Sequence, residues 1–214
     1  MQPTPTITYL FDPLCGWCYG AAPAIKRLAA TPGLTLVPAP TGMFSGEGAR
    51  PMDAGFAAYA WSNDERIARL SGQRFTETYR HGVLGDHSKL LDSGPATLAL
   101  TAVFLTEPNR EIEALAAIQE ARYVDGLDIT ALPTLAAVLQ GLGLTAAAAR
   151  LAPPDADLLA TNRTRTAKAQ ADLRAFAAQG VPTLVLTDGT GRRHLLPSTI
   201  LFGGLDAFLK QLSL

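Results

Sequence analysis

The chain has 214 residues, of which 48% are hydrophobic and 17% are charged, and its formal net charge is −1. This length fits one large domain or one domain with an insertion, and a net charge close to zero argues against binding to nucleic acid or an anionic membrane surface. No run approaches the ~18 apolar residues of a membrane span, and Met1–Thr6 lacks the basic segment that begins a secretory signal. We therefore expect a cytoplasmic protein with no visible signal peptide, no nucleic-acid partner and no membrane partner.

The N-terminal segment predicts a strand, a helix and a second strand. The apolar and β-branched run Thr6–Phe11 predicts a buried strand. A helix is expected from Gly16 to about Ala30 because apolar residues recur there every three or four positions, and Pro23 predicts a kink within it. A strand over Leu34–Val37 then completes a β–α–β unit, whose two strands lie parallel.

The middle of the chain, about residues 44–179, is rich in alanine and predicts helices. Four helices are expected, over residues 93–105, about 110–123, about 128–141 and 155–178. Ser93 or Gly94 is predicted to cap the first of these helices. On the last one, the basic residues Arg163 and Arg165 are interpreted as part of a solvent-exposed face.

The C-terminal segment predicts a hairpin and a final helix. The apolar run Leu184–Leu186 is separated from the short strand Arg193–Leu196 by residues typical of a turn. After Gly204, apolar residues recur at helical spacing up to Leu212. The tail is therefore expected to be β–β–α.

Cys15 and Cys18 are the only two cysteines, and they form a Cys-Gly-Trp-Cys sequence directly after the first predicted strand. At the start of a helix, unpaired backbone N–H groups and the helix dipole favour the thiolate of the leading cysteine. The thiolate is the species that attacks disulfides, so the pair predicts dithiol redox chemistry. The glycine- and proline-rich segment Gly42–Gly55 is predicted to be a loop that passes near Cys15.

Other roles for this cysteine pair are less favourable. A structural zinc site needs about four ligands, but His81, His87 and His194 are the only other candidates of the usual kind, so no metal is expected. Attachment of c-type haem needs a histidine where Tyr19 stands. A purely structural disulfide would close a very short loop and constrain the unfolded chain little.

The order β–α–β followed by β–β–α, with C-x-x-C at the start of the first helix, resembles thioredoxin. The large helical segment between the two parts resembles the bacterial DsbA-type branch. Tyr9–Gly20 and Gly180–Val185 carry this likeness, and Asp92–Ala96 is similar to a segment of cytosolic DsbA-like (FrnE-like) predicted protein disulfide isomerases. The resemblance implies an α/β thioredoxin fold with a large all-helical insertion. It implies a thioredoxin-like domain over 1–43 and 155–214 and an insertion domain over 44–154.

The resemblance also implies roles for single residues around the cysteine pair. Cys15 would be the exposed nucleophile and Cys18 the buried resolving thiol. Pro182 would be a cis-proline that packs against the dithiol. The backbone of Val181 would hydrogen-bond an extended substrate, and Thr183 would complete this substrate-binding segment.

Tyr9 departs from the family pattern, and Asp12 and Trp17 each have two interpretations. Tyr9 stands where thioredoxin and DsbA carry a buried acid, so proton transfer to Cys18 would need another group. Asp12 is the nearest candidate, although capping of the turn is the favoured role for it. Trp17 would either offer an apolar face to substrate beside Cys15 or fold back onto the insertion.

These features predict a thiol–disulfide oxidoreductase that reduces or isomerises disulfides in protein or peptide substrates. The expected redox group is the Cys15–Cys18 disulfide, with no further cofactor and with a thiol reductant for recycling. A kappa-type glutathione transferase or a 2-hydroxychromene-2-carboxylate isomerase is an alternative, although those enzymes usually carry serine at the leading cysteine position. A redox-sensing or chaperone-like binding module is another. The sequence leaves the oligomeric state open.

Overall fold

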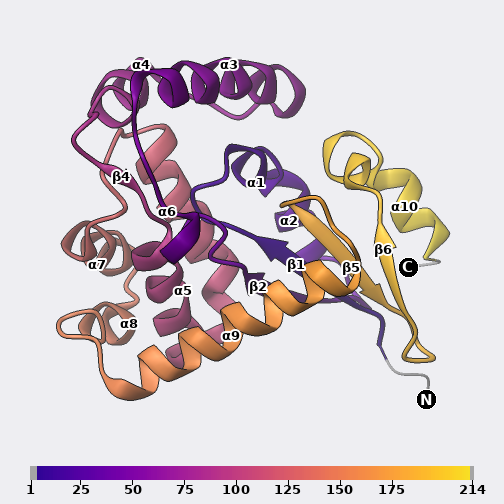
Figure 1. The fold of residues 1–214 in the computed structure, drawn as a ribbon. Coiled ribbons are helices and arrows are strands. Elements are labelled where there is room, and N and C mark those ends of the chain that lie inside the picture. The colour runs from indigo at the N-terminus through magenta and orange to yellow at the C-terminus, as the bar shows by residue number, and fades with distance from the viewer. Residues whose placement is uncertain (1–3, 213–214) are drawn as a thin grey trace.

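The computed structural model describes residues 4–212, which form a central four-stranded sheet in the order β2-β1-β5-β6 (Figure 1). The strands are β1 (Thr6–Phe11), β2 (Thr35–Pro40), β5 (Thr183–Thr187) and β6 (Arg193–Leu196). β1 pairs parallel with β2 and antiparallel with β5, and β5 pairs antiparallel with β6. The predicted β–α–β unit and the C-terminal hairpin are thus confirmed.

Helices surround this sheet, and six of them lie within residues 44–154. The helices are α1 (Gly16–Gly20), α2 (Ala22–Ala29), α3 (Ala54–Ser71), α4 (Glu77–Tyr79), α5 (Gly94–Thr106), α6 (Glu111–Tyr123), α7 (Leu132–Gly141), α8 (Thr145–Ala149), α9 (Ala156–Ala175) and α10 (Leu205–Gln211). Short 3-10 segments span Gly46–Gly48, Pro108–Arg110 and Ser198–Phe202, a π-helix spans Arg80–Leu84, and the two-residue strands β3 (Arg50–Pro51) and β4 (Leu90–Leu91) pair antiparallel. Within residues 4–212, no helix is long and apolar enough to cross a membrane.

Several helix boundaries differ from the sequence-based expectation, each for a local reason. The first predicted helix is divided at Ala21 into α1 and α2, with Pro23 in the first turn of α2. The helix α3 was not delimited from the sequence. It begins at a clear cap, because the Asp53 carboxylate accepts a hydrogen bond of 2.8 Å from the backbone N–H of Phe56, and it ends at Gly72 in the left-handed conformation.

The hydrophobic core continues from the sheet into the helical region. Cys18 and Ile25 belong to the same buried cluster as Leu100 and Ile118. The hydroxyl group of Tyr123 donates a hydrogen bond of 2.8 Å to the backbone carbonyl of Leu14, next to the cysteine pair. The two predicted domains therefore share one core, and their division at 43/44 and 154/155 stays a prediction.

The helix α9 is fixed by a buried ion pair. Arg165 donates to Glu111 on α6 at 2.6 Å, and the same guanidinium donates to Thr101 Oγ1 at 3.2 Å and stacks 4.3 Å from the Phe104 ring centroid. The Glu111 side chain is 1% exposed and that of Arg165 is 11% exposed. Placing Arg165 on a solvent-exposed face was therefore wrong, because its partners come from α5 and α6, far away in the sequence.

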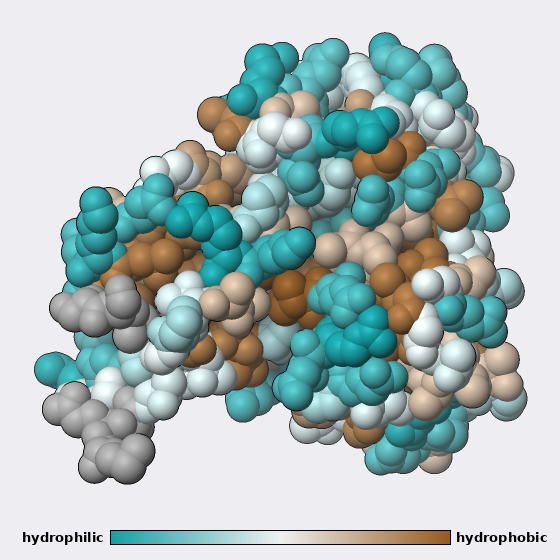
Figure 2. Space-filling model, turned by 180° about the vertical axis from the view of Figure 1, so that it is seen from behind, coloured by the Kyte–Doolittle hydropathy of each residue, from teal (hydrophilic) through white to brown (hydrophobic). Residues whose placement is uncertain are grey.

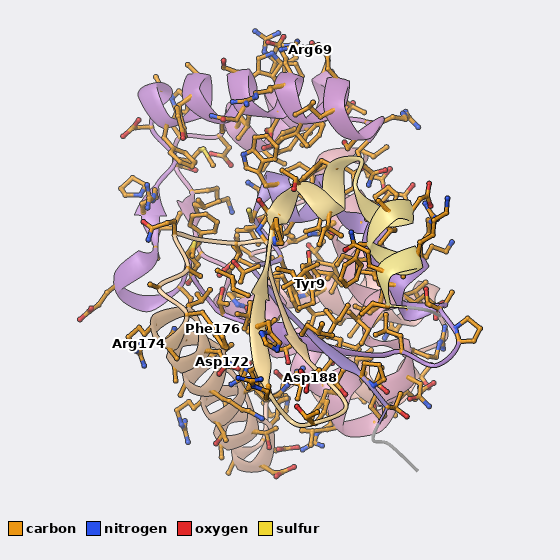
Figure 3. All side chains as sticks on the ribbon, turned by 90° about the vertical axis from the view of Figure 1, so that its right-hand side faces the viewer. Tyr9, Arg69, Asp172, Arg174, Phe176 and Asp188 are labelled. Atoms are coloured by element: carbon orange, nitrogen blue, oxygen red, sulfur yellow. The ribbon has the colours of Figure 1, made fainter. Side chains whose placement is uncertain are left out.

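A second ion pair joins α9 to the hairpin. Arg193 donates to both carboxylate oxygens of Asp172 at 2.8 Å, and its guanidinium lies 5.1 Å from the ring centroid of Phe176. Figure 3 shows Asp172 and Phe176 beside the hairpin, whereas Arg174 points away from it. Bidentate pairing of this kind fixes orientation as well as distance, so α9 is attached at its middle and near its C-terminal end.

The first prediction concerns the Arg165–Glu111 pair. Burial raises the pKa of Glu111 to about 7 despite the opposing charge of Arg165, so the carboxyl group depends on this cation. We expect Arg165→Met to lower the free energy of unfolding by about 3 kcal/mol, because it leaves a buried carboxyl group without its partner. Arg163→Met, on the exposed side of the same helix, is expected to change it by less than about 0.5 kcal/mol. Urea denaturation measures both, and equal losses in the two variants would contradict this role.

Candidate active site

Cys15 and Cys18 lie at the junction of β1 and α1, as the sequence predicted. Cys15 is the residue immediately before α1, and its carbonyl accepts the first helical hydrogen bond from Tyr19 N at 3.1 Å. Its own N–H donates to the carbonyl of Asp12 at 3.1 Å. Cys18 lies one turn further along α1, and both cysteines are free thiols.

The leading sulfur is less accessible than expected. Cys15 is only 8% exposed and Cys18 is fully buried. Cys15 nevertheless lines a cavity of about 310 Å³, together with Met43, Phe44 and Val181. The expectation of an exposed nucleophile is thus corrected to a recessed one, because the segment after β2, α3 and the Val181 segment rise around it. The predicted approach of the loop Gly42–Gly55 to Cys15 is confirmed.

Burial separates the two thiols chemically. The pKa of Cys18 is raised well above its usual value, mainly by burial and further by the hydrogen bond and charge of Cys15. A hydrogen bond from the Asp12 backbone opposes this shift. Cys18 is therefore protonated over the ordinary pH range until something removes its proton.

The Val181 segment approaches Cys15 closely. The Cys15 thiol donates a long hydrogen bond of 3.5 Å to the carbonyl of Val181, and the Val181–Pro182 peptide bond is cis. Thr183 begins β5, and its hydroxyl donates to the carbonyl of Gly180 at 2.6 Å. Thr183 therefore shapes the segment through its own hydrogen bond.

Trp17 stands between two cavities. It lines the cavity of Cys15 and also a groove of about 700 Å³ that Val181 and Pro182 help to form. The ring packs edge-on against Phe202 at 5.4 Å, and the guanidinium of Arg66 lies 5.6 Å from its centroid. Trp17 thus contacts α3 in the helical region and also lines open space beside Cys15, and its contact with substrate stays a prediction.

Asp12 is occupied by the turn that precedes Cys15. Its Oδ1 accepts from Leu14 N at 2.9 Å, and its Oδ2 accepts from Phe44 N at 3.2 Å and from Ser93 Oγ at 2.7 Å. Burial raises the pKa of Asp12, while these donors lower it. The arrangement favours the capping role over proton transfer. Ser93 is the N-cap residue of α5, as expected, but its hydroxyl donates to Asp12 and makes no capping hydrogen bond to the helix.

A polar cluster beneath the Cys15 cavity was not found from the sequence. Asp64 on α3 accepts a hydrogen bond of 3.0 Å from Tyr79, and the buried guanidinium of Arg122 lies 5.4 Å from the Tyr79 ring centroid. A Cβ atom on residue 16 would come within 2.5 Å of Asp64 Oδ1, which explains Gly16 between the cysteines. In the sequence, Asp64 stands among polar neighbours and gives no sign of its burial.

Within residues 4–212, no group of three or more His, Cys, Asp and Glu side chains could hold a metal ion. His81 and His194 form surface pairs with Glu77 and Asp188 respectively.

Comparison with known proteins adds an independent line of support. No protein-family profile and no curated protein matches the chain. Among solved structures, the cytosolic disulfide reductase DsbM from Pseudomonas aeruginosa is 34% identical with a TM-score of 0.84, over 96% of this chain and 97% of DsbM. The chain belongs to the DsbA-like thioredoxin-fold disulfide oxidoreductases.

Two further structures agree with this assignment. DsbM with GSH is 35% identical, with a TM-score of 0.83 over 98% of this chain and 100% of DsbM. A putative protein disulfide isomerase from Nitrosomonas europaea is 26% identical, with a TM-score of 0.77 over 98% and 99% of the two chains. The expected fold class, an α/β thioredoxin fold of the DsbA-like type, is confirmed.

The second prediction concerns the stability of the polar cluster. Burial raises the pKa of Asp64 to about 7, against the lowering effects of Tyr79 and Arg122. Since the folded pKa lies above the unfolded one, the protonated form favours folding. Its contribution is complete below about pH 4 and is lost as the pH rises through about 7.

We therefore expect Asp64→Asn to remove part of the pH dependence of unfolding. The wild type should lose about 2 kcal/mol more than Asp64→Asn between pH 5 and pH 8 in urea denaturation. Glu111 contributes with the same sign in both proteins and cancels in the difference. Glu65→Gln, an exposed neighbour on α3, is the matched control. If Asp64→Asn and Glu65→Gln had the same pH slope, the buried carboxyl group would not be the cause.

Proposed function

We propose that the chain is a thiol–disulfide oxidoreductase of the cytoplasm that reduces or isomerises disulfides in protein substrates. The observation that carries this proposal is the pairing of a recessed Cys15 at a cavity wall with a fully buried Cys18 one turn below it. A sulfur that an incoming molecule reaches, next to one that it does not, is what a two-step exchange needs.

The reaction proceeds through a mixed disulfide. The Cys15 thiolate attacks one sulfur of the substrate, so that a new S–S bond forms, the substrate bond breaks and the second substrate sulfur leaves as a thiolate. Cys18, once deprotonated, attacks the sulfur of Cys15 and releases the first substrate sulfur. The substrate gains two electrons and the protein retains the Cys15–Cys18 disulfide. In isomerisation, a substrate thiol displaces Cys15 instead.

The Val181 segment and Trp17 are the proposed substrate contacts. An extended substrate placed along residues 181–183 would exchange backbone hydrogen bonds with Val181, in the manner of an added strand. The groove of about 700 Å³ beside Pro182 and Trp17 offers room for the flanking residues. The carbonyl of Val181, 3.5 Å from the sulfur of Cys15, would then align the substrate disulfide with the attacking atom.

Reduction or isomerisation is favoured over oxidation on chemical grounds. No imidazolium stands between Cys15 and Cys18 to stabilise a thiolate strongly, because the two intervening residues are Gly16 and Trp17. In a reducing compartment, the cellular thiol pool also keeps such a pair reduced. The glutathione transferase alternative is disfavoured because a cysteine, in place of serine, occupies the leading position.

We further propose glutathione as the thiol that recycles the disulfide. The DsbM structure with GSH supports this choice. Arg50 and Arg122 line the cavity of Cys15, so two cations would face the carboxylates of a glutathione molecule that reacts there. Arg50 is exposed, and its guanidinium lies 5.8 Å from the ring centroid of Phe44 and 5.5 Å from that of Phe56, two rings that also line the cavity.

The third prediction tests the catalytic pair. We expect Cys15→Ser to reduce the rate of insulin reduction by at least about 100-fold, because hydroxyl groups do not exchange with disulfides. Cys18→Ser should still attack substrate and accumulate a mixed disulfide on Cys15, visible by mass spectrometry without reductant. Wild-type rates in Cys15→Ser would refute the proposed reaction.

The fourth prediction tests glutathione as the reductant. We expect Arg50→Ala to raise the KM for glutathione about fivefold, equivalent to ~1 kcal/mol for a partly exposed ion pair, in an assay coupled to glutathione consumption. Arg69→Ala is the control, since Arg69 lies on the outer surface of α3 (Figure 3). An unchanged KM for glutathione in Arg50→Ala, with insulin reduction intact, would contradict the proposal that glutathione binds beside Arg50. The oxidoreductase proposal would stand.

A further inference from the structure

A second cavity lies on the other side of the cysteine pair, between α2 and α6. It measures about 420 Å³ and touches Cys18 and Tyr9, but not Cys15. Lys26, Glu113 and Ala116 also line it, and all three are exposed, so they mark its mouth. Figure 2 shows the molecule from the side opposite α9, with hydrophobic residues visible in a hollowed surface among hydrophilic ones.

Gln119 lines the same cavity in an unusual state. Its side chain is fully buried, yet neither Nε2 nor Oε1 has a hydrogen-bond partner among residues 4–212. A buried amide with both ends unpaired is strongly unfavourable unless water satisfies it. The cavity beside it has room for water molecules, and although its wall is largely apolar, Gln73, Gln119 and Tyr9 supply polar groups to it.

Tyr9 lines the same cavity as Gln119 and lies next to the buried thiol. The Tyr9 hydroxyl donates to the backbone carbonyl of Cys18 at 3.4 Å, and Figure 3 shows the side chain in the interior of the molecule. The pKa of Tyr9 is raised well above its usual value by burial, by the charges of Cys18 and Cys15, and by a hydrogen bond with Cys18. The hydroxyl therefore lies beside the sulfur that must lose a proton.

We propose that the cavity between α2 and α6 holds a water chain that carries the proton of Cys18 to solvent, with Gln119 as its positioning residue. This inference rests on the proposed function, because the proton leaves Cys18 in the step that resolves the mixed disulfide. The S–H bond of Cys18 breaks, the Cys15–Cys18 bond forms and the substrate leaves as a thiolate. The proton passes through the water chain to the mouth.

The groups around Cys18 leave this cavity as its route. The raised pKa of Tyr9 means that its hydroxyl keeps its own proton, and the carboxylate of Asp12 is held by Leu14, Phe44 and Ser93. Lys26 and Glu113 are the charged groups on the cavity, and both are exposed at its mouth. Tyr9 stands at the position of the buried acid in the family pattern, and Gln119 is an uncharged amide on the wall of the same cavity.

The experiment measures the reactions of Cys15 and Cys18 as two separate kinetic phases. Reduced protein is mixed in a stopped-flow instrument with an aromatic disulfide that releases a coloured thiolate. Attack by Cys15 releases the first equivalent at a rate that depends on reagent concentration. Resolution by Cys18 releases the second at a rate that does not. Failure of the first phase would count against the proposed function, whereas the inference concerns only the second.

We expect Gln119→Met, which keeps the length of the side chain, to slow the second phase about tenfold at pH 7. This is a part of the rate acceleration of about 10²–10⁴-fold that positioned proton-transfer groups supply. The pH midpoint of that phase should rise, and the first phase should stay within about twofold. Gln119→Glu should restore the second phase, because a carboxylate can accept the proton itself. A second phase in Gln119→Met with wild-type rate and pH midpoint would overturn the inference.

A second variant decides the matter if Gln119→Met does not fold. Ala116→Trp places a large ring at the exposed mouth and should slow the second phase several-fold while leaving the first unchanged. Ala149→Trp, at an exposed position of α8 away from the cavity, is the matched control and should leave both phases unchanged. Equal second phases in Ala116→Trp and Ala149→Trp would contradict the proposed route.

Discussion

The buried carboxylate of Asp12 fixes the turn on which the cysteine pair depends. Its two oxygens accept hydrogen bonds from Leu14 in the turn and from Ser93 at the start of α5, and its carbonyl accepts from the N–H of Cys15. A carboxylate removed from water is tolerated only where such donors converge. The Asp12 carboxylate, which fixes the turn before Cys15, therefore also attaches the start of α5 to the end of β1.

The second constraint is the complete burial of Cys18, which lies on α1 where that helix packs against α2 and α3. Burial keeps the thiol protonated and protects it from outside reagents, which suits a residue that reacts only with its neighbour. The same burial prevents direct contact with solvent, so deprotonation must be arranged by the protein. The hydroxyl of Tyr9 lies next to this residue and Gln119 lines the same cavity, and neither side chain carries a charge at ordinary pH.

Local signals determined how much could be predicted from the sequence. The strand Thr6–Phe11, the hairpin and the placement of the cysteine pair follow from patterns within a few residues, and the structure agrees with all of them. Arg165, Asp64 and Gln119 were missed because nothing near them in the sequence reveals burial. Arg165 was assigned to the surface, although its partner Glu111 lies on another helix. Buried polar groups are decided by distant partners, so a single sequence conceals them.

The two cavities give the cysteine pair two separate sides. Cys15 lines the cavity that contains Val181 and Trp17, whereas Cys18 lines the other cavity, together with Tyr9. In the proposed reaction, the substrate joined to Cys15 by the mixed disulfide would fill the cavity that Cys15 lines. A proton leaving through the same opening would meet the bound substrate. A separate exit allows Cys18 to be deprotonated while the substrate is still attached, which is the moment when its nucleophile is needed. The helix α1 makes this separation possible, because Gly16 and Trp17 line one cavity and Cys18 lines the other.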